Sequence, residues 1–136
     1  MKKIFLIILV FFGFTGVNFA SQISYDKSDF APVSSMIDDA VYDIRYYSSY
    51  NFTGNRIDGY KAPVAYMTKE SLRALSLAAK DLREQGYRIF IWDTYRPQKA
   101  VDNFVRWIND SSDMGDKSFY PELNKSDLLK GNYIAE

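Results

Sequence analysis

The sequence contains neither cysteine nor histidine among its 136 residues. The lack of cysteine excludes a disulfide framework and thiolate chemistry within these residues. The lack of histidine removes both the commonest zinc ligand and the usual general base of enzymes. Only carboxylates remain as metal-binding side chains. No pair of them is placed like a metal site, since Glu70, Asp81 and Glu84 are predicted to lie on a solvated helix face.

An excess of positive charge is also lacking, because 17 Lys and Arg residues balance 17 Asp and Glu residues. Removal of a leader at residues 1–20 would take away Lys2 and Lys3 and leave a net charge of about −2. Nucleic acids and anionic membrane surfaces bind basic proteins. Neither is therefore expected as a partner.

Long hydrophobic runs are missing apart from one near the N-terminus. Lys2 and Lys3 precede an apolar run at residues 4–14, and small and polar residues follow up to Ala20. This order is typical of a secretory signal peptide, and the run is shorter than the ~20 apolar residues of a membrane-spanning helix. We predict a signal peptide at residues 1–20 and export to the periplasm or the medium, with an uncleaved anchor as the alternative.

Local patterns predict a mixture of helices and short strands. Thr68 is a good N-cap, apolar residues follow it at spacings of three and four, and Gly86 supplies a stop, which predicts a helix at about residues 69–85. Strands are predicted at residues 43–47, 62–67 and 87–92, a turn at residues 51–55, and a loosely ordered lead-in at residues 21–40.

A second helix is predicted from Pro97 to about Asn109. Its buried face is expected to carry Val101, Phe104, Val105 and Ile108. Proline suits the first helical position because its missing N–H would be unpaired there anyway.

Arg96 is predicted to lie at the corner between the strand and this helix, since a following proline disfavours the α conformation. A cation beside the positive end of a helix dipole is unfavourable by roughly 0.3–1 kcal/mol. Something should offset that charge. Either Asp93, three residues earlier, only braces the corner, or an anionic ligand binds Arg96.

Five motifs occur in one order along the chain. They are Asn51-Phe52-Thr53-Gly54, Asp58-Gly59-Tyr60, Trp92 to Val101, Phe104-Val105-Arg106-Trp107 and Tyr120-Pro121. In order and spacing they resemble the D-alanyl-D-alanine dipeptidases of the vancomycin-resistance type. The resemblance extends over roughly residues 43–136. It implies an exported bacterial enzyme with an α+β fold, in which helices pack on a mainly antiparallel sheet.

The resemblance also implies a site. The family hydrolyses a small D,D-dipeptide with a zinc ion held by two histidines and an aspartate, and with a glutamate as general base. That block would begin just beyond the segment matching residues 131–135, so the implied residues here are Arg96, Asp93 and Tyr46. Arg96 would stabilise the transition state, Asp93 would orient Arg96, and Tyr46 would lie near the substrate cleft.

Three interpretations follow for residues 21–136. They form the N-terminal portion of a dipeptidase domain, without a metal site and inactive alone; or a non-catalytic binding protein that kept the arginine side of the cleft; or a relic that does not fold stably. The sequence does not indicate an oligomeric state. Glycosylation patterns at residues 51–53, 109–111 and 124–126 are interpreted as turns or caps.

Overall fold

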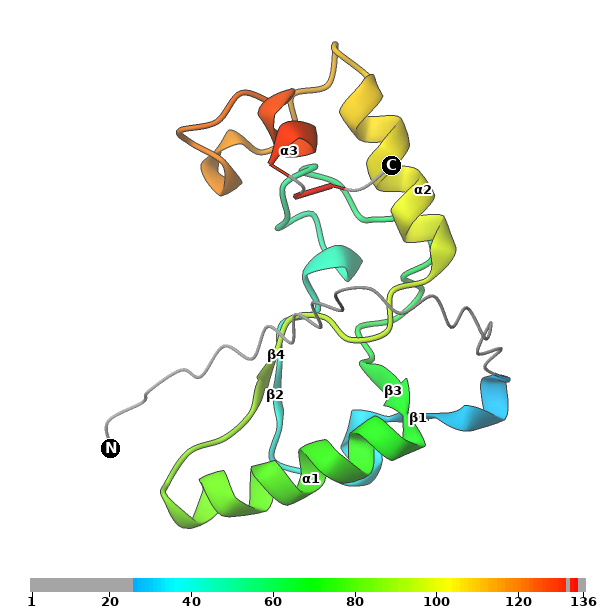
Figure 1. Ribbon diagram of the computed structural model, residues 1–136, viewed down its shortest axis with the longest axis vertical. Helices are drawn as coiled ribbons and strands as arrows, with labels where there is room; N and C mark the ends of the chain where they lie inside the picture. The colour runs from blue at the N-terminus through cyan, green and yellow to red at the C-terminus, as the bar shows by residue number, and fades with distance from the viewer. Residues whose placement is uncertain (1–25, 132, 135–136) are drawn as a thin grey trace, which may run out of the picture. The chain divides into compact units, whose positions relative to one another are not determined.

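The computed structural model describes residues 26–131, 133 and 134, so the predicted signal peptide lies outside the described residues (Figure 1). The chain divides into two compact units. The first comprises residues up to Val41 together with Tyr66–Phe90, and the second comprises Tyr42–Ala65 together with the residues from Ile91 onward. Within the described ranges, no helix is both long enough and apolar enough to cross a membrane.

The first unit packs one long helix on a small antiparallel sheet. Strand β1 (Phe30–Pro32) pairs with β3 (Tyr66–Thr68), and helix α1 (Lys69–Glu84) follows β3 directly. The Thr68 hydroxyl accepts a hydrogen bond from the Ser71 backbone N–H at 3.2 Å, which confirms the predicted N-cap. The predicted first helix is therefore confirmed within one residue at each end.

The prediction of a loosely ordered lead-in is wrong for its described part. Residues 27–35 form the 3-10 helix η1 (Lys27–Asp29), β1 and the 3-10 helix η2 (Val33–Ser35). Val33 and Ile37 are almost fully buried and join Leu72 and Ala79 in the core of the first unit. Two apolar side chains in a polar segment are enough to order it when they fill a core, because burying each one stabilises by roughly 1.5–3 kcal/mol.

A second sheet also has two strands. It pairs β2 (Val41–Tyr42) with β4 (Phe90–Ile91). The backbone N–H groups of Val41 and Asp43 donate to the carbonyls of Ile89 and Ile91, each at 2.9 Å, which is a parallel pattern. The expected mixture of helices and sheets is confirmed, but the described residues form two separate pairs of strands, of which β1–β3 is antiparallel.

The predicted strands differ from the observed ones mainly in extent. The strand expected at residues 62–67 overlaps β3 only at residues 66 and 67, and the strand expected at residues 87–92 shrinks to β4. The strand expected at residues 43–47 is wrong, because residues 45–47 form the 3-10 helix η3 (Arg45–Tyr47). The Tyr47 N–H donates to the Ile44 carbonyl at 3.0 Å, so the chain turns there instead of extending.

Helix α2 (Gln98–Asn109) opens the longer segment of the second unit and confirms the second predicted helix. Pro97 is the residue before it, with an extended ψ of 148°, and not its first residue. The buried face is rotated from the predicted one. It consists of Ala100, Phe104, Trp107 and Ile108. Val101 and Val105 are only half-buried, because Trp107 packs edge-to-face on Phe52 at 5.1 Å.

The chain then forms the 3-10 helix η4 (Lys117–Phe119) and the short helix α3 (Asp127–Lys130). Helix α3 has four residues. Such a segment is too short to show helical periodicity, so the sequence carries no signal for it.

Candidate functional site

The candidate site is built around Arg96, which lies at the predicted corner before α2. Its Nε and Nη2 atoms donate to Asp93 Oδ2 at 3.2 and 3.0 Å. The Asp93 side chain is 19% exposed, whereas that of Arg96 is 42% exposed. Asp93 therefore offsets the cation at the start of the helix, while the Arg96 side chain remains partly exposed to solvent.

Tyr60 holds the other oxygen of the same carboxylate. Its hydroxyl donates to Asp93 Oδ1 at 2.7 Å, across 33 positions of sequence. Burial, and then the charge of Asp93 and this hydrogen bond, raise the pKa of the Tyr60 phenol well above its ordinary value. Tyr60 is therefore a protonated donor at neutral pH, and both oxygens of Asp93 are engaged.

The turn that carries Tyr60 is fastened to α2. Gly59 has a φ of +92°, and a Cβ atom there would lie only 2.7 Å from Pro97 Cγ, so only glycine permits this approach. The Asp58 N–H donates to Asn103 Oδ1 at 2.9 Å, and the Asp58 carboxylate accepts from Arg106 at 2.5 Å. These contacts bring Tyr60 to Asp93.

Tyr46 lies against the guanidinium group of Arg96. The Arg96 Cζ atom is 5.0 Å from the centroid of the Tyr46 ring and 5.2 Å from that of Phe104, which is cation–π geometry. Burial raises the pKa of Tyr46, although the charge of Arg96 opposes the shift. The structure thus brings together all three site residues expected from the sequence.

Arg96 is a permanent cation in this setting. Burial by itself would lower the pKa of its guanidinium group, but the electrostatic interactions with Tyr46 and Asp93 and the hydrogen bond to Asp93 outweigh that effect and raise the pKa. The charge of Arg96 is therefore independent of pH wherever the protein is folded.

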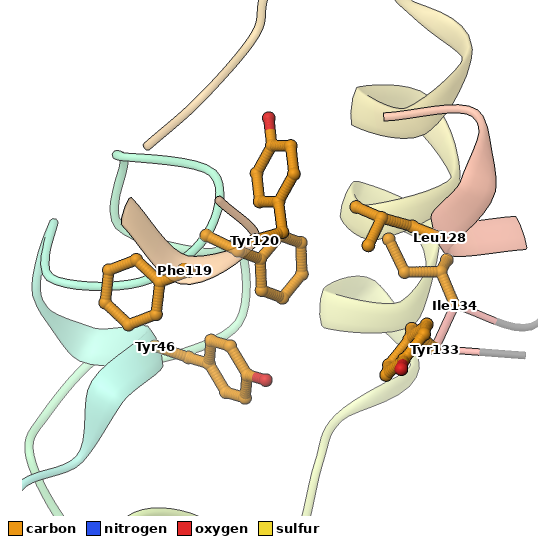
Figure 2. A pocket seen from close by; sticks show the side chains of 7 residues that line it. Tyr46, Phe119, Tyr120, Leu128, Tyr133 and Ile134 are labelled. Atoms are coloured by element: carbon orange, nitrogen blue, oxygen red, sulfur yellow. The ribbon is translucent and has the colours of Figure 1, made fainter. Parts of the chain in front are cut away.

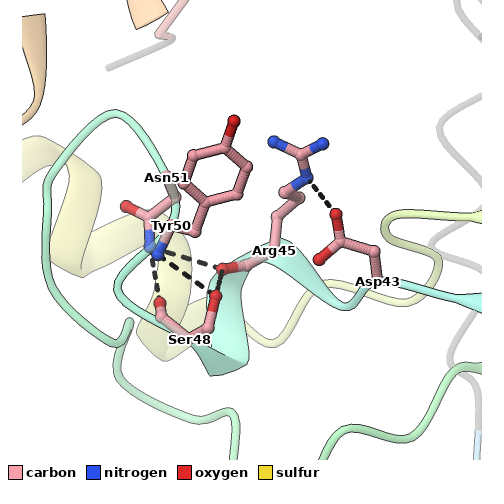
Figure 3. A network of polar contacts seen from close by, with 5 residues as sticks. All are labelled: Asp43, Arg45, Ser48, Tyr50 and Asn51. Carbon is pink, nitrogen blue, oxygen red and sulfur yellow. Dashed lines mark hydrogen bonds and ion pairs between the residues drawn. The ribbon is translucent and has the colours of Figure 1, made fainter. Parts of the chain in front are cut away.

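The Asn51-Phe52-Thr53-Gly54 motif stabilises the backbone next to the segment that carries Tyr46. The Asn51 amide Nδ2 donates to the carbonyl of Ser48 at 2.8 Å (Figure 3). It also donates to the carbonyl of Asn55 at 2.7 Å, and the Asn51 Oδ1 accepts from the Thr53 N–H at 2.9 Å. Gly54 has a φ of +70°, so the predicted turn is confirmed. Asn51 is buried, as a structural turn residue would be, and it braces the segment that follows η3, the helix that carries Tyr46.

Tyr46 also lines an apolar cavity of about 230 Å³ in the second unit (Figure 2). The other lining residues are Phe52, Phe119, Tyr120, Leu128, Tyr133 and Ile134. Figure 2 shows the Tyr46 hydroxyl directed across this cavity toward Tyr133. The lining suits an apolar group of a small ligand.

The residues present do not fit a zinc ion. In the part of the chain that the structure describes, no three His, Cys, Asp or Glu side chains are grouped so that they could hold a metal. A zinc ion bound to this fold would need ligands beyond the described residues.

Comparison with known protein families shows to which family the chain is related. A model of the M15 peptidases, described as D-Ala-D-Ala dipeptidase, matches residues 26–118. The chain belongs to this family. The matched region includes Tyr46, Tyr60, Asp93 and Arg96, so the whole hydrogen-bonded chain from Tyr60 to Arg96 lies within it.

Three curated relatives agree with this family, and all are D-alanyl-D-alanine dipeptidases. The chain is 35% identical to the one from Streptomyces coelicolor over 108 residues, which is 79% of this chain and 54% of that protein. It is 32% identical to the one from Enterococcus faecalis over 80% of this chain and 54% of that protein. It is 30% identical to the one from Enterococcus faecium over 74% and 52%. The chain thus spans about half the length of the relatives it matches.

The sequence indicates part of this candidate site and misses part of it. The Arg96–Asp93 pair is local, with a spacing of three, and can be expected. No role was predicted for Tyr60. The only sequence signal is its place in the Asp58-Gly59-Tyr60 motif, which indicates a turn but not which distant carboxylate the phenol reaches.

Proposed function

We propose that this chain supplies the anion-stabilising part of a D-alanyl-D-alanine dipeptidase site. The observation that carries the proposal is Arg96, a fixed cation held by Asp93, which is held in turn by Tyr60. Because Asp93 takes Nε and Nη2, the Nη1 atom is not used in that pair. This edge of the guanidinium group is the one that a substrate oxygen would meet.

Hydrolysis of a peptide bond places negative charge on the carbonyl oxygen in the transition state. A donor that is already oriented toward that oxygen stabilises the charge without reorganising, and losing such a donor typically costs about 10²–10³ in rate. Asp93 and Tyr60 keep Arg96 oriented, and the rings of Tyr46 and Phe104 exclude water from one side of it. This is the arrangement that a preorganised electrostatic role requires.

The substrate class follows from the cavity and the family. D-Alanyl-D-alanine is small and carries two methyl groups, and the cavity beside Tyr46 is small and apolar. We propose that Tyr46 and the cavity contact the apolar part of the dipeptide while Arg96 faces its carbonyl oxygen. The metal ligands and the general base that the family resemblance implies would come from residues outside this sequence, which has no histidine.

The first experiment uses the chain without its leader. Residues 21–136 are dialysed against zinc, and bound metal and D-alanyl-D-alanine hydrolysis are measured. We expect neither stoichiometric zinc nor turnover, because catalytic zinc sites normally take three protein ligands that include histidine. Stoichiometric zinc together with turnover above that of the metal alone would contradict the proposal.

The second experiment fuses this chain to the part of the Streptomyces coelicolor relative beyond the matched region. We expect this fusion to hydrolyse the dipeptide, and activity to depend on Arg96. A second candidate function is binding without catalysis, which the aromatic cavity beside Arg96 favours. An inactive fusion combined with saturable binding of the dipeptide to the chain alone would favour that candidate instead.

We also propose export through residues 1–20, on the strength of Lys2, Lys3 and the apolar run that follows them. The intact mass of the product outside the cytoplasm is expected to lack about 20 residues, an ordinary signal length. A product that stays in the cytoplasm and retains Met1 would contradict export.

A further inference from the structure

A second arginine of the same unit is surrounded by aromatic rings. Arg45 opens η3, and its Cζ atom lies 4.7 Å from the ring centroid of Tyr50, 5.1 Å from that of Trp92 and 5.9 Å from that of Phe119. Tyr50 and Phe119 pack edge-to-face at 5.1 Å. The guanidinium group therefore has aromatic walls contributed by three separate segments.

Hydrogen-bond partners for this group are missing among the described residues. The Nε atom is buried without a hydrogen bond, although Asp43 Oδ2 lies 2.8 Å away as an ion pair. Figure 3 shows the two terminal nitrogens of Arg45 pointing away from Asp43. Guanidinium carries five donors, and a half-buried donor without a partner costs free energy. The two terminal nitrogens of Arg45 are therefore available to a hydrogen-bond acceptor.

Arg45 and Arg96 both lie beside aromatic rings and an aspartate, but their hydrogen bonds differ. Arg96 donates two hydrogen bonds to its aspartate, whereas Arg45 donates none to a described residue. The Arg45 side chain is 25% exposed, so part of it can be reached from solvent. Tyr50 and Trp92 are themselves 59% and 38% exposed, which leaves apolar surface beside Arg45.

We propose that Arg45, Tyr50, Trp92 and Phe119 form a binding site for a carboxylate that is attached to an apolar group, as at the C-terminus of a peptide. The two terminal nitrogens of a guanidinium group match the two oxygens of a carboxylate. The exposed faces of Tyr50 and Trp92 would contact the apolar group. This carboxylate site uses none of Arg96, Asp93 or Tyr60 and does not depend on peptidase activity.

The charge at the site selects a monoanion. Asp43 already lies 2.8 Å from Arg45, so the pair is close to neutral. A dianion such as phosphate would be repelled by Asp43 more strongly than a monoanionic carboxylate and would make no apolar contact with the rings. A monoanionic carboxylate with an apolar neighbour gains both the paired hydrogen bonds and the ring contacts.

The test follows the indole N–H signals of the full chain by nuclear magnetic resonance. The sequence has two tryptophans, so buried Trp107 serves as an internal control for Trp92. The probes are N-acetyl-leucine, its carboxamide and inorganic phosphate. We expect a saturable shift of the Trp92 signal with N-acetyl-leucine, and binding at least about tenfold weaker for the other two probes.

Variants decide whether Arg45 is responsible. Arg45→Gln and Tyr50→Ala should abolish or weaken the shift, and exposed Tyr50 provides a variant that cannot disturb the core. Arg56→Gln is the matched control, since Arg56 is exposed and lies 5.8 Å from one ring only, that of Tyr47. Arg96→Gln should leave the shift unchanged, which separates this site from the proposed dipeptidase site. An equal response to the carboxamide or phosphate, or a shift that survives in both Arg45→Gln and Tyr50→Ala, would overturn the proposal.

Discussion

Each unit of the molecule contains an arginine paired with an aspartate through two hydrogen bonds, but the settings differ. In the first unit Arg83 donates to Asp39 at 2.9 and 2.5 Å on an open surface, with half of the Arg83 side chain exposed. In the second unit the Arg96–Asp93 pair lies against two aromatic rings and is fixed further by Tyr60. Solvent screens the first pair, so it adds little stability. The second pair holds an oriented charge, which under the proposed function faces the substrate.

The two units also differ in how many polar and charged residues are buried in them. All three buried polar or charged residues among those described, Asn51, Thr53 and Lys125, belong to the second unit. Lys125 is held there by backbone carbonyls, among them those of Asp110 and Asp113 at 2.5 and 2.6 Å. The buried residues described in the first unit are apolar, whereas the second unit combines an apolar core with buried polar groups that order its irregular segments. The proposed dipeptidase site, which needs fixed polar groups, accordingly belongs to the second unit.

The largest expected difference between the units is in catalysis by the fused domain. Arg96→Ala should lower kcat/KM for D-alanyl-D-alanine by about 10²–10³, because a preorganised cation is lost. Arg83→Ala removes an equivalent pair in the first unit and should leave kcat/KM unchanged. Steady-state kinetics and thermal melting of both variants provide the check. A large loss of thermal stability in Arg96→Ala with little change in rate would mean that the arginine only braces the corner.

One substitution in each unit should lower the free energy of unfolding, for a different physical reason in each unit. Leu72→Ala opens a cavity in the first core and should lower the free energy of unfolding by about 2–5 kcal/mol. Asn51→Ala leaves the carbonyls of Ser48 and Asn55 without their donor and should cost about 2–4 kcal/mol. Asn124→Ala, at an exposed position, is the control with little change. Chemical denaturation measures all three, and an Asn51→Ala protein as stable as this control would contradict the structural role of the amide.

The comparison also explains what the sequence could predict. Helices α1 and α2 were predictable because Thr68, Gly86 and Pro97 are local signals that act on adjacent residues. The 3-10 helix η3 was not, because contacts beyond its own residues decide it. The Asn51 amide binds the carbonyl of Ser48, which stops the chain from extending through that segment.

The candidate site likewise contains one contact that the sequence could predict and others that it could not. The Arg96–Asp93 pair follows from a spacing of three residues, so local sequence is enough to predict it as one of two alternatives. The hydrogen bond from Tyr60 to Asp93 joins positions 33 residues apart, and no periodic pattern encodes such a contact. The aromatic surroundings of Arg45 likewise come from three segments that only the fold brings together.

A smaller effect is expected from Tyr60→Phe in the fused domain. The ring remains, but Asp93 loses one donor and Arg96 becomes less firmly oriented, which should lower kcat/KM by about tenfold and stability by about 1 kcal/mol. Tyr66→Phe is the control, since Tyr66 is an exposed tyrosine of the first unit. If Tyr60→Phe loses stability but retains full kcat/KM, then Tyr60 supports the fold and not the orientation of Arg96.

The smallest expected effect is a loss of stability in alkali that originates in the second unit. Burial raises the pKa of Tyr60 and of Tyr46 in the folded protein, whereas an unfolded tyrosine has a pKa near 10. Below that pH both states are protonated and stability does not change. Above it the unfolded chain releases these protons first and binds fewer than the native state, so the free energy of unfolding falls as pH rises. For Tyr60 the fall should reach about 1 kcal/mol by pH 10.5. Denaturant titrations at pH 8, 9, 10 and 10.5 should show a shallower fall in Tyr60→Phe than in the unaltered chain, while Leu72→Ala should shift the curve without changing its shape. The same slope in Tyr60→Phe and in the unaltered chain would mean that Tyr60 does not hold its proton more tightly when folded.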